Sequence, residues 1–249
     1  MVAAEQAWHG YLVWGHWSDE FLKCFLSCYT ATFPYVRSNL GKHRAQFYEH
    51  IAWIAVFGAK NPLADGWLSG FIRTVDEEDR ISWASSVEMA LRQVPNEKKQ
   101  VVWDRWIKTY WAMRNQGQLL LPSGIEVSLM AGGLLHLGSA MPEALGLLMQ
   151  GPRPVPRDNY ANSSLYMQLN DLRRDAQYPQ DVALFLRYLL DSETGVPYLN
   201  PIDAIVRRLI TSAAERTVLI QICERLCVLG YPTEAAELRR LVELPTQDK

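Results

Sequence analysis

Apolar residues recur at spacings of three and four along most of the chain, which is the period of an amphipathic helix. The clearest case is the stretch 96–117, where two apolar stripes lie side by side and about half of the helix surface must leave water. The stripes consist of Val102, Trp106, Tyr110 and Met113, and of Trp103, Ile107 and Trp111. Asn96 is placed as the N-cap and Gly117 as a left-handed terminating residue, and Asp104 and Lys108 are spaced for an ion pair. We expect one long helix that is covered on two sides.

The residues before this helix show the same periodicity, interrupted by glycine and proline. Helices are expected at about 18–33, 42–57, 67–72 and 76–94. The last of these begins after Asp76 with acidic residues in its first turn and stops at Pro95, as the helix dipole and the missing proline N–H favour.

Downstream, Ser123 and Glu126 form a capping box before an apolar helix, and Ser212 and Glu215 form a second one. Further helices are expected at about 160–175, 179–190, 201–211, 213–229 and 232–244. Four segments share a proline in the first turn, an acidic residue soon after it and a leucine-rich period. Their prolines at 142, 179, 201 and 232 keep no fixed spacing, which indicates an irregular stack resembling a short α-solenoid.

Two regions of the chain use different packing material. All nine tryptophans lie between Trp8 and Trp111, whereas the remainder is rich in leucine, valine and isoleucine. The segment 151–158 has three prolines in eight residues and is the best linker. We therefore predict an all-α protein with a tryptophan-rich helical subdomain at 1–150 and a leucine-rich stack at 151–249. The alternative is that the stack is continuous with the first subdomain.

Composition and charge exclude several classes of function. Of the 249 residues 49% are hydrophobic, which suffices for a packed core, and the formal net charge is -2, which gives no field that favours nucleic acid. No basic region precedes an apolar run at the N-terminus, and no segment has the roughly 20 apolar residues that span a bilayer. We expect a cytoplasmic protein with no membrane partner.

The four cysteines stand in two pairs with i,i+4 spacing, Cys24 with Cys28 and Cys223 with Cys227. Two thiol pairs that converge could bind zinc, but structural zinc sites usually space their ligands two residues apart on a turn. Cysteine is also among the most buried residue types. Buried apolar positions are the favoured interpretation, and a metal site is the alternative.

An enzymatic alternative rests on His43, Glu49 and His50, which could share one helix face as the acid, base or metal ligands of a small hydrolase. The spacing matches no HExxH pattern. No P-loop, no G-x-S-x-G elbow and no dinucleotide-binding glycine motif occurs, so no cofactor is expected.

A partner surface is expected at four residues, Trp14, Trp17, Arg105 and Arg114. The two tryptophans flank Gly15 and His16 in a segment that resembles a loop, and we expect the two arginines on the polar edge of the helix 96–117. Exposed rings beside positive charge could also stack on bases, which leaves a nucleic-acid-binding module as a further alternative. The near-neutral charge argues against it.

Four quoted motifs resemble a known family. They are W-H-G-Y-L-V-W-G-H-W from Trp8, D-E-E-D-R-I from Asp76, W-D-R-W-I-K-T-Y-W-A-M-R-N-Q-G from Trp103 and M-P-E-A-L from Met141. Together they resemble the uncharacterised bacterial helical domain found downstream of sirtuin-like domains in anti-phage defence proteins. The resemblance implies a non-catalytic sensor, scaffold or regulatory module that works with a sirtuin-like, NAD-consuming effector, and a protein partner that is that effector or a phage protein.

Overall fold

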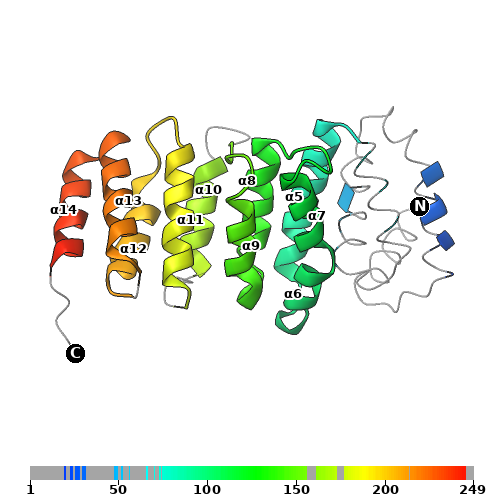
Figure 1. The fold of residues 1–249 in the computed structure, drawn as a ribbon, viewed down its shortest axis with the longest axis horizontal. Coiled ribbons are helices and arrows are strands. Elements are labelled where there is room, and N and C mark those ends of the chain that lie inside the picture. Colours follow the sequence, from blue (N-terminus) through cyan, green and yellow to red (C-terminus); the bar gives the residue numbers. More distant parts are fainter. Residues whose placement is uncertain are drawn as a thin grey trace, which may run out of the picture. The chain divides into compact units, whose positions relative to one another are not determined.

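The computed structural model describes residues 75–155, 161–172, 177–212 and 214–244, together with single positions between 20 and 73; the side chains of 105–106, 161–163 and 171–172 are not among them. All regular structure in these residues is helical (Figure 1), which confirms the predicted all-α class. No helix in the described ranges is long and apolar enough to cross a membrane. The elements are α5 (Glu77–Gln93), α6 (Asn96–Val102), the π-helical turn η1 (Trp103–Ile107), α7 (Lys108–Asn115), α8 (Gly124–Leu134), the 3-10 turn η2 (Gly138–Ala140), α9 (Met141–Leu148), α10 (Ala161–Leu172), α11 (Pro179–Ser192), α12 (Leu199–Ile210), α13 (Arg216–Val228) and α14 (Pro232–Glu243).

Residue contacts divide the chain into two compact units. Unit 1 contains Met1–Pro122 and His136–Ala144, and unit 2 contains Ser123–Leu135 and Leu145–Lys249. The division therefore does not fall in the proline-rich segment 151–158, where the sequence placed it.

The described part of that proline-rich segment is bound into unit 2. The backbone N–H of Val155 donates to the Gly124 carbonyl over 2.8 Å, and the Ser128 hydroxyl donates to the Val155 carbonyl over 3.0 Å. A Cβ at Gly124 would lie 2.4 Å from a methyl group of Val155 and 2.8 Å from the Arg153 carbonyl, so only glycine fits there. The segment is rich in proline, but the hydrogen bonds of Val155 make its described part belong to the packed unit.

In unit 1, α5 begins as predicted. The Asp76 carboxylate accepts from the Asp79 N–H over 2.9 Å and caps the helix. The buried Trp83 ring meets Tyr110 of α7 edge to face, with centroids 5.7 Å apart. Aromatic packing of this kind joins α5 to the helix that follows.

The long helix predicted at 96–117 is instead three consecutive pieces, α6, η1 and α7. Pro95 has extended backbone angles and takes the N-cap position, so Asn96 is the first helical residue and makes no side-chain cap; that prediction was wrong by one residue. Gly117 has a φ of 72°, as expected for a left-handed terminator. The described side chains of both apolar stripes are mostly buried, whereas the expected pair of Asp104 with Lys108 is replaced by one that Lys108 makes elsewhere.

Unit 2 is a helical stack. α8 packs against α10, α10 against α12, and α12 against α14, while α11 packs against α13. Alternate helices thus form two layers, and successive helices return antiparallel to one another, as in an α-solenoid. The predicted bounds of α11, α12 and α14 hold to within about two residues.

The two predicted capping boxes had different outcomes. In the first, the Glu126 N–H donates to Ser123 Oγ and the Ser123 N–H donates to Glu126 Oε2 over 2.9 Å, which confirms it. The second does not form, because the Ser212 hydroxyl donates back to the Arg208 carbonyl of α12 over 2.8 Å. Glu215 becomes the N-cap residue, and α13 starts at Arg216, three residues after the predicted start at about 213.

Candidate functional site

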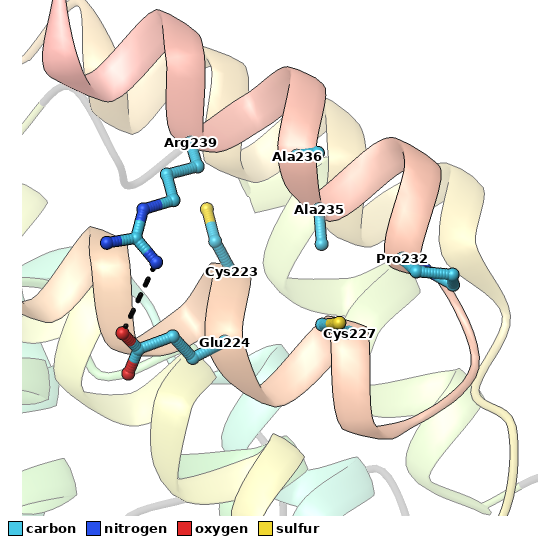
Figure 2. A pocket seen from close by; sticks show the side chains of 7 residues that line it. All are labelled: Cys223, Glu224, Cys227, Pro232, Ala235, Ala236 and Arg239. Carbon is cyan, nitrogen blue, oxygen red and sulfur yellow. Dashed lines mark ion pairs between the residues drawn. The ribbon is translucent and has the colours of Figure 1, made fainter.

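A pocket of about 280 Å³ lies between α13 and α14 in unit 2 (Figure 2). Its lining is Cys223, Glu224, Cys227, Pro232, Ala235, Ala236 and Arg239. Cys223 and Cys227 stand one turn apart on α13, and Ala235 and Ala236 face them from α14. Because these side chains are small, two helices that pack closely still leave a hollow between them.

The two thiols of the pocket differ in exposure. Cys223 is 1% exposed, whereas Cys227 is exposed. The other predicted pair, Cys24 and Cys28, belongs to unit 1 and is exposed. Within the residues that the structure describes, no three His, Cys, Asp or Glu side chains form a group that could hold a metal ion. The prediction of buried apolar cysteines is therefore confirmed for Cys223 and wrong for Cys24, Cys28 and Cys227, which are exposed.

Charged side chains line one side of the pocket. Arg239 lies 3.5 Å from a Glu224 oxygen, the pair dashed in Figure 2, and donates to Glu243 over 2.9 Å. The bond to Glu243 raises the pKa of the Arg239 guanidinium, which stays charged at every physiological pH. Since two carboxylates already neutralise this arginine, the pocket offers no unpaired positive charge to an anionic ligand.

Burial raises the pKa of the Cys223 thiol to about 11, although the nearby Arg239 opposes this shift. A thiol reacts through its thiolate, so a raised pKa and a buried sulfur both slow its chemistry. Cys223 is a packing residue at neutral pH and not a nucleophile.

We therefore expect the two cysteines of α13 to be alkylated at different rates. At pH 8 iodoacetamide should modify Cys223 on the order of 100-fold more slowly than Cys227, because few Cys223 thiols ionise and the sulfur is covered. The Cys223 rate should keep rising with pH up to about 11. Peptide mass spectrometry against time measures both rates.

The denatured chain is the control, since both cysteines lose their surroundings there and should react alike. Equal rates in the folded protein, or a Cys223 rate that levels off below pH 9, would contradict the burial seen between α13 and α14.

The predicted partner surface needs a correction at Arg114. Its side chain is 1% exposed, donates to the Tyr110 hydroxyl over 2.9 Å and to the Leu120 carbonyl over 2.8 Å, and lies over the rings of Tyr110 and Trp111. A buried arginine is held this way because its charge needs partners. Arg114 thus organises the core of unit 1 and is no contact residue for a partner.

Other predicted site residues fall outside the described part of the chain. These are Trp14, Trp17, His43 and His50, and the side chain of Arg105. Glu49 is described only as a half-buried helical residue. The hydrolase alternative and the remaining partner residues therefore stay predictions.

A polar cluster at η1 was missed by the sequence reasoning. The Trp103 indole N–H donates to Glu143 over 2.6 Å, and the Lys108 ammonium pairs with the same carboxylate over 2.5 Å. Bonds from Lys108 and then from Trp103 lower the pKa of Glu143. From the sequence, Glu143 is only an acidic residue in the first turn after Pro142, because a partner 40 residues away leaves no local pattern.

Comparison with known protein families gives a match over more than half of the chain. The model of a family described as a domain of unknown function (DUF4020) matches residues 59–226, more than half of the chain. No curated protein and no solved structure matches the chain. The matched region contains η1 and the stack up to α13, whereas Cys227 and α14 lie beyond it.

Proposed function

Because the chain belongs to the family described as a domain of unknown function (DUF4020), its role has to be argued from its own residues, and we propose a regulatory module of bacterial defence against phage. In this proposal the chain is a sensor or scaffold without catalysis of its own. It works in the cytoplasm with a sirtuin-like effector that consumes NAD.

The layered stack of unit 2 carries the proposal. α10, α12 and α14 form one layer and α11 and α13 the other, each helix contacting its neighbours in the array. Arrays of this kind present long surfaces made from many helices, and such surfaces bind proteins. Polar side chains also link helices within each layer, as where Arg208 donates to Asn170 and Arg207 to Glu237.

The identity of the partner comes from the four motifs that resemble the sirtuin-associated helical domain. Two of them, around Trp103 and Met141, meet in the structure through the bond between Trp103 and Glu143. Motifs that touch are constrained together by packing, which supports treating them as one signature. The partner is then the effector itself or a phage protein that triggers it.

The test is to tag the chain after Lys249 at its native locus and to purify it from cells before and during phage infection. We expect a sirtuin-like polypeptide, either joined to this sequence or present in a stoichiometric amount. Cellular NAD should fall on infection in the tagged strain and not in a strain that lacks the locus.

A lone 28.4 kDa chain together with unchanged NAD would overturn the proposal. NAD cleavage by the purified chain alone would equally refute it, since the module would then be the enzyme.

A further inference from the structure

Three arginines from three segments of unit 2 meet at the end of α11, where Asp191 stands in the last turn. Arg153, which precedes α10, donates to the Asp191 carbonyl over 3.0 Å. Arg187 of α11 lies 3.6 Å from one oxygen of the Asp191 carboxylate. Arg225 of α13, the helix beside α11 (Figure 1), lies 3.9 Å from the other oxygen. We call Arg153, Arg187 and Arg225 the arginine cluster.

The arginine cluster has more hydrogen-bond donors than it uses. A guanidinium carries five N–H groups. Arg153 and Arg187 each donate one hydrogen bond to the protein, and Arg225 donates two to backbone carbonyls at the end of α11. Most of the remaining donors therefore have no acceptor among the residues that the structure describes. Arg153 is exposed, and 40% of the Arg187 side chain is accessible, so a ligand can reach both.

The Asp191 carboxylate is a poor partner for these donors. At 3.6 and 3.9 Å its oxygens lie beyond the roughly 2.7–2.9 Å of a charge-assisted hydrogen bond. Its side chain is short and fixed to the helix, and two guanidinium groups share it. The other carboxylate in this region, that of Glu193, accepts from the Tyr166 hydroxyl over 2.9 Å. The three positive charges of the cluster are thus set against two negative charges, of which one already serves a tyrosine.

Two other exposed arginines of unit 2 are paired differently. Arg207 of α12 lies 2.8 Å from Asp203 and 2.9 Å from Glu237, so two close carboxylates satisfy it. Arg239 also has two carboxylate partners. Since the formal net charge of the chain is -2, the excess of positive charge at the end of α11 is local. It suits a small anionic group better than a nucleic acid, which needs positive charge over a long surface.

A phosphoryl group fits the arginine cluster better than a second carboxylate would. It carries a charge of about −1.5 to −2 at neutral pH and three strong acceptor oxygens. A planar guanidinium can donate two parallel N–H bonds to such oxygens, so several arginines can bind one phosphoryl group together. A free ligand is also not fixed to the helix, and it can approach the guanidinium groups more closely than Asp191 does.

We propose that the arginine cluster at the end of α11 binds a ligand that carries a phosphoryl group, which takes the place of the Asp191 carboxylate. The group belongs to a small molecule or to a phosphorylated side chain of a protein. Its bonds would join the segment before α10 to α11 and α13, so the bound ligand would stabilise the stack. The site goes beyond the proposed function and does not depend on a sirtuin-like effector.

Phosphorus NMR of inorganic phosphate titrated with the full chain at fixed, low ionic strength measures the affinity. We expect a Kd on the order of 1 mM. Arg153→Gln and Arg187→Gln should each weaken binding at least about fivefold, because each removes a cation and its donors. Arg207→Gln is the matched control, since it makes the same change of charge on α12, and it should change the Kd less than about twofold.

Asp191→Asn gives the sharpest test. It removes the internal carboxylate that competes for the arginines and repels the ligand, so the Kd for phosphate should fall at least about threefold. Asp203→Asn is the matched control, because Asp203 also stands one helical turn from an arginine and its loss changes the charge equally. A gain in affinity cannot come from partial unfolding. Thermal melts followed by circular dichroism check the folding of the arginine variants.

A second titration identifies the source of the phosphoryl group. The probe is a blocked Gly-Gly-phosphoserine-Gly-Gly peptide, compared with the same peptide that carries serine. Binding at least about tenfold tighter than that of inorganic phosphate would indicate a phosphorylated protein. Binding no tighter than that of phosphate would indicate a small molecule.

No binding of phosphate up to about 20 mM would overturn the proposal, and the arginines would then only fasten the carbonyls at the end of α11. Equal effects of Arg187→Gln and Arg207→Gln would also overturn it, because phosphate would then follow the total charge of the chain. Equal effects of Asp191→Asn and Asp203→Asn would have the same meaning. A sirtuin-like companion at the native locus would bear on none of these results, so the two proposals fail separately.

Discussion

Arg114→Met should lower the free energy of unfolding by about 3 kcal/mol, one of the largest losses expected from a single change in this chain. The methionine fills much of the volume but leaves the Leu120 carbonyl and the Tyr110 hydroxyl without the donors they have now. It also removes the cation from the rings of Tyr110 and Trp111. Urea denaturation followed by tryptophan fluorescence and by circular dichroism measures the loss.

Two further variants serve as comparisons for Arg114→Met. Arg114→Lys should lower the free energy of unfolding by less than Arg114→Met does. The charge is kept, but an ammonium cannot copy the planar guanidinium that reaches both acceptors. Arg92→Met is the control: Arg92 is 43% exposed and pairs with Glu88 on the surface of α5, so its loss should cost less than about 0.5 kcal/mol. Similar losses for Arg92 and Arg114 would contradict the burial of Arg114.

Trp103→Ala should cost about 4 kcal/mol, because the ring is 0% exposed and its removal leaves a cavity. Trp103→Phe keeps most of the apolar volume but removes the indole donor to Glu143, and should cost about half as much. The same urea titrations measure both variants.

Lys108→Met is the control for the polar part of this cluster. Lys108 and Glu143 are 47% and 49% exposed, so solvent screens their pairing and it should contribute little to the free energy of unfolding. If Trp103→Phe were as mild as Lys108→Met, the indole bond would carry no measurable stability. Because the pKa of Glu143 is lowered in the fold, its small contribution is present at neutral pH and is lost as the pH falls through that lowered pKa.

The sequence predicts helices well here because their signals are local. Pro179 and Pro232 start α11 and α14, and the box of Ser123 with Glu126 caps α8, as the spacing indicated. The proline-rich segment was misassigned as a boundary because the bond from Val155 to Gly124 joins residues about 30 positions apart. The proline content indicates that the segment is stiff. It does not indicate which distant carbonyl accepts a hydrogen bond from the Val155 N–H.

The burial of Arg114 could have been predicted. At about 100° per residue it falls between Trp103 and Ile107 on the helical wheel, inside the apolar sector, and Tyr110 stands one turn before it. Its charge favours exposure, but a long guanidinium side chain can also lie against aromatic rings inside the fold. The pocket between α13 and α14 is harder to predict from the sequence. The pair Cys223 and Cys227 indicates small side chains but not the hollow that they leave.

Because of the π-helical turn η1, the helix between Pro95 and Gly117 can lose one residue and keep the same side chains buried. A π turn takes about one residue more than an α turn for the same rotation, so this stretch holds a surplus residue while Trp111 and Arg114 still face inward. A relative with one residue fewer between 103 and 107 can close the turn into an ordinary α-helix and keep the same core. The same deletion within α5 would rotate Trp83 and Val87 out of theirs. We therefore expect a one-residue deletion at η1 to be accommodated within the helix itself rather than in a loop.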